Sequence, residues 1–237
     1  MKILGVNITE LNKKEILDKF STLSKGYICV TSVHGLIEAN DDPLIKNAFL
    51  NSYLNLPDGM PIVYFAKFFK KIQIERIPGY DFLEEFLNLA NFTNATIATV
   101  GGDMNSILKF QQIINKKYPS IKFIGKNTEK ISIEEPTDII KIKNFLLENT
   151  PEYLLVFLST PKQDWLMYEI NKLNINVKII GFGAALDYFN GDLKKAPKII
   201  SLLSLEWFYR LIQEPKRLYK RYFKIVPKFI YLIIRNR

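Results

Sequence analysis

Short runs of apolar, β-branched residues alternate along the chain with longer stretches in which apolar residues recur at helical spacing. The short runs predict buried strands at residues 27–33, 95–102, 121–125, 153–159 and 177–183. Helical spacing marks the stretches between them, at residues 83–90, 107–114, 137–148 and 164–173. The alternation predicts right-handed βαβ crossovers and an α/β fold, with a mostly parallel, Rossmann-like sheet flanked by helices.

Several strand ends, including that of a further short apolar run before Asp58, lead into Gly, Thr, Pro or Asp residues. These strand ends are Val30-Thr31, Leu56-Pro57-Asp58-Gly59, Val100-Gly101-Gly102, Leu158-Ser159-Thr160-Pro161 and Gly181-Phe182-Gly183. In an open parallel sheet, ligands bind beyond the carboxyl ends of the strands. One such loop is most simply a turn. Five of them together predict a ligand site along one edge of the sheet.

Residues 194–237 have a different pattern, which predicts a basic helical appendage to a catalytic core of residues 1–193. Ser204 is expected to cap a first helix. After Pro215, four cations share one helical face: Arg217, Lys220, Arg221 and Lys224. Four apolar or aromatic residues share another: Tyr219, Tyr222, Phe223 and Val226. This pattern is typical of a helix in a membrane interface, and equally of a C-terminal helix that packs its aromatic residues on the core.

Charge is concentrated in the same appendage. The whole chain of 237 residues has a net charge of +9, but residues 194–237 hold 12 Lys and Arg against Glu206 and Glu214. Residues 1–193 hold 21 basic and 22 acidic residues, so they are almost neutral. A basic tail on a neutral core indicates contact with polyanions, which include nucleic acid, acidic lipid headgroups and phosphorylated ligands.

Composition narrows the class of protein further. With 48% apolar residues the chain can form a large core, and its one cysteine, Cys29, excludes a disulfide framework and a cysteine zinc cluster. The apolar run at the start ends at Asn7, too short for a signal peptide, and no stretch reaches the roughly 20 uncharged residues of a membrane span. A cytoplasmic location is expected.

Two motifs at strand ends could take part in catalysis or ligand binding. Asp58 follows a short apolar strand, where partial burial could make its carboxylate a general base, although a turn aspartate is the simpler interpretation for that residue alone. Pro161-Lys162-Gln163-Asp164 begins a helix, so its free N–H groups and the Gln163 amide could contact phosphate or sugar.

Other kinds of site are disfavoured. The sequence has neither the G-x-G-x-x-G spacing of dinucleotide sites nor a P-loop. His34 is the only histidine, so it is expected to be structural or at most to line a ligand site. No D-x-D pair is present to hold a divalent ion, so any departing diphosphate would be stabilised by Arg and Lys. We expect neither a metal nor a cofactor.

Specific blocks follow one another in a recognisable order. After Thr31 and Pro57-Asp58-Gly59 come Glu75-Arg76-Ile77-Pro78-Gly79, Gly101-Gly102, Thr160-Pro161-Lys162-Gln163-Asp164-Trp165, Gly181-Phe182-Gly183, Asp187, Lys195-Ala196-Pro197 and Glu206-Trp207…Arg210…Glu214-Pro215…Arg217. From roughly residue 25 to 225, the chain resembles the WecG/TagA/CpsF glycosyltransferases (glycosyltransferase family 26).

The resemblance implies a bacterial, inverting, metal-independent transferase. It would move a sugar, of the N-acetylmannosamine type or a related hexose, from a UDP-sugar to a sugar on undecaprenyl diphosphate. Teichoic acid, capsule and exopolysaccharide synthesis use such steps. Family members lie on the inner face of the cell membrane and self-associate, so an anionic membrane surface and a homo-oligomer are expected, and nucleic acid is not.

The resemblance also implies roles for individual residues. Asp58 matches the proposed base, Thr31 and Gln163 match residues near the donor, and Arg210 and Arg217 match arginines that close over the diphosphate. Lys220 or Arg221 would be a third cation. The other residues expected at the substrates are Gly59, Arg76, Gly101, Gly102, Pro161, Lys162, Gly183 and Asp187.

The chain departs from the family pattern at three positions. Val33 stands where Asn is common, Ser159 where Gly is common and Lys195 where Arg is usual. Lys keeps the charge but not the bidentate geometry of Arg. These departures leave two alternatives open. One is a transferase-like assembly partner without activity, and the other is a basic nucleic-acid-binding protein, although no nucleic-acid-binding module is recognisable.

Overall fold

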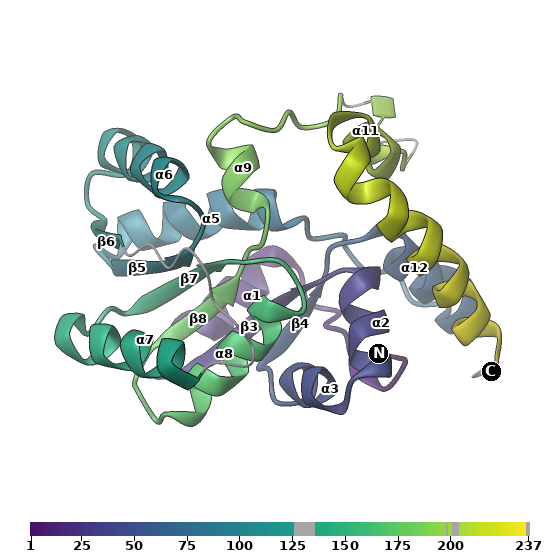
Figure 1. Cartoon of the computed structure of the whole chain (residues 1–237), viewed down its shortest axis with the longest axis horizontal. Coiled ribbons are helices and arrows are strands. Elements are labelled where there is room, and N and C mark those ends of the chain that lie inside the picture. Colours follow the sequence, from purple (N-terminus) through teal and green to yellow (C-terminus); the bar gives the residue numbers. More distant parts are fainter. Residues whose placement is uncertain (126–135, 198, 201–203, 236–237) are drawn as a thin grey trace.

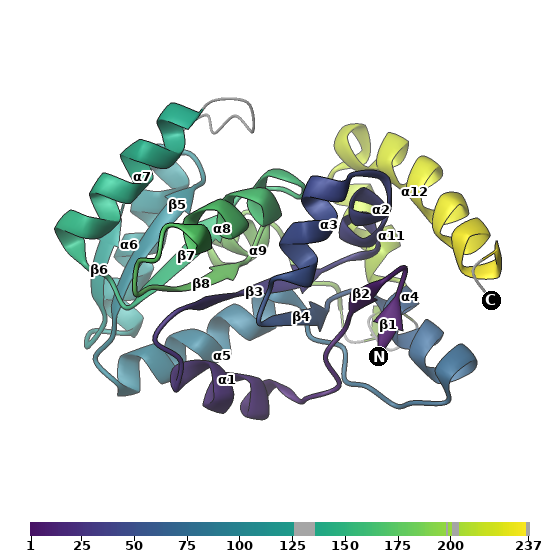
Figure 2. The ribbon, with the colours of Figure 1, turned by 90° about the horizontal axis from the view of Figure 1, so that it is seen from below.

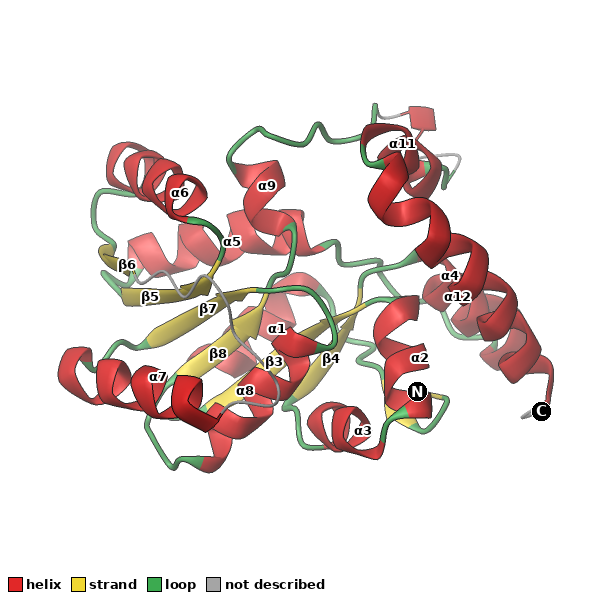
Figure 3. Cartoon of the chain, viewed as in Figure 1, coloured by secondary structure: helices red, strands yellow, loops and turns green. Residues whose placement is uncertain are grey.

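The computed structural model describes residues 1–125, 136–197, 199–200 and 204–235, with the backbone alone for Pro136, Arg217, Lys220 and Arg221. At its centre is a parallel sheet in the order β4-β3-β8-β7-β5-β6 (Figures 1 and 3). Its strands are β3 (Gly26–Thr31), β4 (Leu54–Pro57), β5 (Thr96–Gly101), β6 (Lys122–Gly125), β7 (Tyr153–Phe157) and β8 (Lys178–Gly181). The α/β prediction is therefore confirmed. A small antiparallel pair, β1 (Lys2–Ile3) and β2 (Val6–Asn7), precedes this sheet.

Helices precede, connect and follow the strands of the main sheet. They are α1 (Lys13–Ser21), α2 (Val33–Asp41), α3 (Pro43–Leu50), α4 (Met60–Phe65), the π-helix η1 (Ala66–Lys70), α5 (Gly79–Phe92), α6 (Met104–Lys117), α7 (Pro136–Asn149), α8 (Lys162–Lys172), α9 (Ala185–Phe189), α11 (Glu206–Gln213) and α12 (Pro215–Arg235). No helix in the described part of the chain is both long and apolar enough to cross a membrane.

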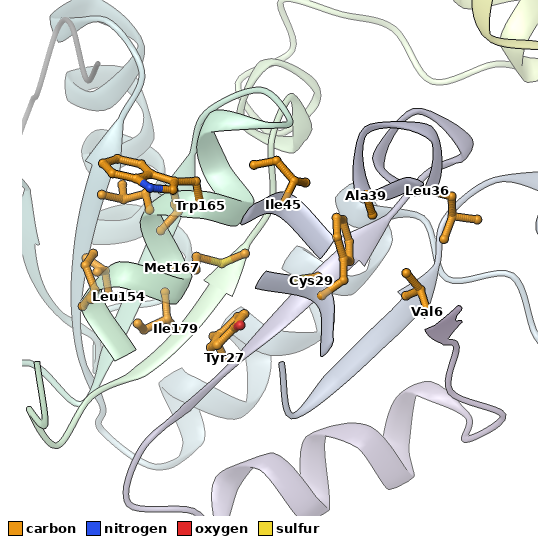
Figure 4. Close-up of a cluster of buried hydrophobic side chains, with 14 of the residues drawn as sticks. Val6, Tyr27, Cys29, Leu36, Ala39, Ile45, Leu154, Trp165, Met167 and Ile179 are labelled. Carbon is orange, nitrogen blue, oxygen red and sulfur yellow. The ribbon is translucent and has the colours of Figure 1, made fainter. Parts of the chain in front are cut away.

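Alternate residues of each strand pack on opposite faces of the sheet, because side chains of a strand point alternately to its two sides. Tyr27 and Cys29 of β3 join a core with α2, α3, α7 and α8, part of which Figure 4 shows. Ile28, between them, joins a second core with α1, α5, α6 and α9. In Figure 2, α1 and α5 accordingly lie on the opposite side of the sheet from α3, α7 and α8. The sheet is thus covered on both faces, which holds its strand ends in fixed positions.

Helices α11 and α12 form the appendage, which lies beside α2 (Figure 1). The inward face of α12 carries a stripe of buried residues that the sequence pattern did not single out: Leu218, Ile225, Phe229 and Ile233. Lys228 also forms an ion pair with Asp41 at the end of α2. The described part of α12 therefore packs on the core. The predicted boundary between the core and the appendage, at residue 193, remains a prediction.

The expected capping role of Ser204 is wrong. Leu205 is the N-cap of α11, and no side chain caps that helix. Ser204 instead has a positive φ of 60° and accepts a hydrogen bond of 2.7 Å from the hydroxyl of Tyr64. Its side chain therefore joins the appendage to α4 rather than stabilising the helix that follows.

Candidate active site

A cavity of about 740 Å³ lies at the carboxyl ends of the parallel strands. Loops after β3, β4, β5, β7 and β8 form one wall, and residues of α11 and α12 form the other. The volume is in the range that holds a drug-sized or nucleotide-sized ligand. The predicted strand ends therefore do meet at one edge of the sheet, with the appendage facing them.

Asp58 follows β4 and lies partly buried in the cavity wall. Its backbone is held on both sides, because its N–H donates to the carbonyl of Thr31 at 3.0 Å and its carbonyl accepts from Arg76 Nε at 2.6 Å. Burial raises the pKa of the Asp58 carboxyl, and the cations Arg76 and Arg210 offset only part of this effect. A fixed carboxyl with a raised pKa has the properties of a general base.

Two arginines approach this carboxyl from different parts of the chain. Arg76 precedes α5 and forms a 2.6 Å ion pair with Glu206 of α11. Arg210, one turn further along α11, lies 3.5 Å from Glu214 and 5.7 Å from the centre of the Tyr188 ring. The site therefore combines one carboxylate from the core with two guanidinium groups, one from the core and one from the appendage.

Gln163 is buried in the floor of the cavity, at the start of α8. Its side-chain oxygen accepts a 2.7 Å hydrogen bond from the N–H of Gly183, which follows β8. A Cβ at Gly181 would lie 2.6 Å from the Gln163 amide nitrogen, so this close packing requires glycine. Gln163 thus fixes the loop after β8 against the loop after β7.

Gly101 and Gly102 make a sharp turn between β5 and α6. Both have positive φ, 89° and 77°, and a Cβ at Gly101 would lie 2.7 Å from the Phe157 carbonyl. L side chains rarely adopt that conformation. Gly102 lines the cavity, together with Asp103, which caps α6 through the N–H of Ser106 at 3.0 Å.

The remaining predicted site residues are divided between the cavity and its surroundings. Gly59 and Asp187 line the cavity. Gly101, Pro161, Lys162 and Thr31 do not, although each is next to a residue that does. Thr31 is buried and acts through its carbonyl on Asp58. The side chains of Arg217, Lys220 and Arg221 lie outside the described residues; their backbone belongs to α12.

Sequence reasoning missed several polar and aromatic residues of the cavity. They are Tyr80, Tyr188, Glu206, Trp207 and Tyr222. Glu206 and Trp207 stand in a block that carried the family resemblance, which was the available signal. His34, which was expected to be structural or at most to line a ligand site, does line the cavity, and its Nε2 lies 2.9 Å from Glu38 one turn along α2.

The three departures from the family pattern have different surroundings. Val33 and Ser159 both line the cavity, so they can alter which ligand fits. Lys195 does not line it and instead lies 3.1 Å from both Asp81 and Glu84 of α5. Lysine at this position therefore keeps an electrostatic link between the segment before α11 and the core.

Asp164 is buried beside Gln163, on the side of α8 that faces Cys29. Burial raises the pKa of the Asp164 carboxyl to about 7, and the neighbouring Thr160 hydroxyl and Cys29 thiol offset only part of that rise. Burial likewise raises the pKa of the Cys29 thiol. The carboxyl therefore binds a proton in the folded chain over a pH range in which the unfolded chain has lost it.

This shift predicts how Asp164→Asn changes stability with pH. Because the pKa rises from 3.8 to about 7 on folding, the wild-type chain loses stability as pH increases across that interval. Asparagine does not titrate, so the free energy of unfolding of Asp164→Asn relative to that of the wild type should increase by about 1.4 kcal/mol per pH unit across this interval. The total increase should not exceed about 4 kcal/mol. Urea unfolding between pH 4 and 8 measures this difference in stability. Asp18→Asn, at an exposed position, is the matched control. Parallel profiles for wild type and Asp164→Asn would contradict the assignment.

Among the described residues, no three His, Cys, Asp or Glu side chains are grouped as the ligands of a metal ion would be. The charged residues that line the cavity are the carboxylates Asp58, Asp103, Asp187 and Glu206 and the guanidinium groups of Arg76 and Arg210, with Arg76 and Glu206 joined in an ion pair. The two guanidinium groups are suited to phosphate oxygens, which arginine binds through paired hydrogen bonds.

A parallel sheet with a cavity and ionisable side chains at its strand ends is typical of an α/β enzyme whose active site lies at that edge. The chain belongs to the glycosyl transferase WecG/TagA/CpsF family, whose model matches residues 1–237. It is therefore a glycosyltransferase.

Two relatives are similar over most of their length. A Staphylococcus aureus (strain MW2) protein is 28% identical over 247 residues, which cover 99% of this chain and 92% of the relative. A Bacillus subtilis (strain 168) protein is 31% identical over 181 residues, which cover 76% of this chain and 68% of the relative. Both are named N-acetylglucosaminyldiphosphoundecaprenol N-acetyl-beta-D-mannosaminyltransferase.

Proposed function

We propose that this chain is an inverting, metal-independent glycosyltransferase that uses a UDP-sugar donor. The donor sugar would be of the N-acetylmannosamine type or a related hexose, and the acceptor a sugar on undecaprenyl diphosphate. The names of the two relatives support this acceptor and this sugar. The product would enter a cell-surface polysaccharide such as teichoic acid, capsule or exopolysaccharide.

The observation that carries the proposal is that Asp58, Arg76 and Arg210 line one cavity, where both cations act on the Asp58 carboxyl and offset part of the rise in its pKa. In a single displacement, the Asp58 carboxylate takes the proton of the acceptor hydroxyl while that oxygen forms a bond to the anomeric carbon. The bond from the anomeric carbon to the diphosphate breaks, and its electron pair stays on the departing UDP. Attack opposite to the leaving group inverts the anomeric configuration.

Arg210 would stabilise the departing diphosphate. It lies near Glu214 and Tyr188 and lines the same cavity as Asp58, which supports a reacting sugar bound between the base and this cation. Arginine pairs with phosphate oxygens through two hydrogen bonds, which suits charge that develops on a leaving group. Arg217 and either Lys220 or Arg221 would add charge from α12.

Other residues would position the reacting groups. Thr31 and Arg76 hold the backbone of Asp58, and Gln163 holds the loop at Gly183. Gly59, Gly101, Gly102 and Asp187, with Pro161 and Lys162 at the start of α8, would surround the donor. The appendage would also rest on the anionic inner face of the cell membrane, where the acceptor is, and homo-oligomers would form there.

One assay tests the proposal. The protein is incubated with a panel of UDP-sugars and short-chain lipid-diphosphate sugar acceptors, and release of UDP is followed with and without a chelator. We expect turnover with one UDP-sugar, unchanged by the chelator and dependent on the acceptor. Absence of turnover across the panel would contradict the donor and acceptor classes, and loss of activity with the chelator would contradict metal independence.

A further inference from the structure

The α4–η1 segment, residues 60–70, exposes aromatic side chains that no part of the proposed reaction uses. Phe68 is 67% exposed, and Tyr64 and Phe69 are about 40% exposed. The opposite side of the segment is anchored, because Ile62 and Ala66 are completely buried. The exposed aromatic residues therefore belong to a helical segment that is fixed by packing of its other side.

Cations are interleaved with these rings. Lys67, Lys70 and Lys71 follow one another closely, and residues 59–74 contain no Asp or Glu. Lys67 Nζ lies 5.7 Å from the centre of the Phe68 ring, and Lys70 Nζ lies 5.9 Å from that of Phe65. A short element that exposes both aromatic rings and lysines fits the boundary between lipid headgroups and acyl chains.

The segment lies at the mouth of the candidate active site, opposite the appendage. Met60 and Pro61 of α4 line the same cavity as Trp207 of α11 and Val226 of α12. The 2.7 Å hydrogen bond between Tyr64 and Ser204 links the two sides directly. In Figures 2 and 3, α4 and α12 lie at the same end of the molecule.

Helix α12 also exposes large apolar and aromatic residues. They are Tyr219, Phe223, Val226, Ile230, Tyr231 and Ile234, of which Phe223 and Val226 also line the cavity. Residues 215–237 hold eight Lys and Arg and no Asp or Glu. A group of exposed apolar side chains on one helix is a feature of interaction sites. The cations favour an anionic partner, and α4–η1 extends the same surface across the cavity mouth.

We propose that α4–η1 is a second membrane-contact element, which together with α12 places the cavity mouth on an anionic lipid bilayer. This inference rests on the proposed function in that a lipid-linked acceptor must enter the cavity from the bilayer. Contacts on both sides of the mouth set the orientation of the enzyme, whereas α12 alone leaves it free to tilt about one helix. The lysines contribute attraction to the headgroups, and Phe68 contributes burial of apolar surface.

The test compares full-length variants in sedimentation with vesicles of equal parts phosphatidylglycerol and phosphatidylcholine. Phe68→Ser and the double variant Lys67→Gln/Lys70→Gln alter the segment. Phe92→Ser is the matched control for the first, because Phe92 is 85% exposed at the far end of α5. Lys116→Gln/Lys117→Gln, at the end of α6, is the control for the second. Turnover is measured in parallel with a water-soluble short-chain acceptor and with the acceptor embedded in the vesicles.

We expect the vesicle affinity of Phe68→Ser to fall at least about fivefold, and that of the double lysine variant about fivefold for each cation at low salt. Turnover of the soluble acceptor should stay at the wild-type level, and turnover of the embedded acceptor should fall with vesicle affinity. Wild-type vesicle affinity in both altered variants overturns the proposal. The proposal is also overturned if the altered variants differ from the wild type in oligomeric mass but not in vesicle binding. The surface would then contact a second copy of the chain.

The two proposals fail in different ways. If the proposed function is wrong, wild-type protein turns over neither acceptor, yet vesicle sedimentation still separates the altered variants from their controls. If only the present inference is wrong, turnover of the soluble acceptor is intact and the altered variants sediment with vesicles like the wild type.

Discussion

Asp58→Asn is expected to lower kcat by about 10²–10⁴-fold, the usual effect of losing a positioned base. Asparagine keeps the shape of the side chain, and the backbone contacts of residue 58 with Thr31 and Arg76 do not depend on the carboxylate. UDP affinity should therefore change little. Steady-state turnover and calorimetric titration with UDP measure the two quantities separately.

The matched control is Asp192→Asn, which removes an exposed carboxylate paired with Lys109 at 2.6 Å. Its turnover should equal that of the wild type. In the wild type, activity should fall as pH decreases through the raised pKa of Asp58, since the base must be ionised and its pKa lies above 3.8. A kcat for Asp58→Asn within about threefold of the wild type would remove the residue from this role.

Arg210→Ala should lower kcat by about 10²–10³-fold, the effect typical of losing one preorganised group that stabilises developing charge. Arg210 faces Asp58 from the appendage, so its removal leaves the departing diphosphate without this partner. Arg210→Lys should recover part of the loss, because lysine keeps the charge but cannot form two parallel hydrogen bonds. Kinetics with the same donor and acceptor provide the measurement.

Lys216→Ala is the control for Arg210→Ala, because it removes an exposed cation from the first turn of α12. Its kcat with a soluble acceptor should be unchanged. If Arg210→Ala and Lys216→Ala reduce kcat equally, the appendage acts through its overall charge, and the specific role of Arg210 is refuted.

Most of the sheet was predictable because its strands are short and largely apolar, and helical periodicity separates them. The prediction of a buried strand at residues 121–125 is wrong in one respect, because β6 lies at the edge of the sheet and its residues are exposed or half-buried. The convergence of Asp58, Gly102 and Gly183 on one cavity follows from the same pattern, since parallel strands end at one edge. The small β1–β2 pair was not predicted, because two-residue strands leave too short a pattern to recognise.

The partners of the site residues could not be read from the sequence. Arg76 and Glu206 are separated by 130 positions, and only the packing of α11 against the core brings them to 2.6 Å. Thr31 acts on Asp58 through its carbonyl, which a side-chain motif cannot reveal. The buried stripe of α12 could not be predicted, because apolar and aromatic residues occur on several sides of this helix. Only tertiary packing decides which of them are buried.

The burial of Cys29 has a practical consequence for spectroscopy. It is the only cysteine in the sequence, it is completely buried, and its thiol has a raised pKa, so maleimide dyes and nitroxide labels should spare the native chain. A single introduced thiol, as in Phe68→Cys or Phe92→Cys, would then carry the whole signal. Fluorescence or electron spin resonance could follow the depth of either position without first removing a native cysteine.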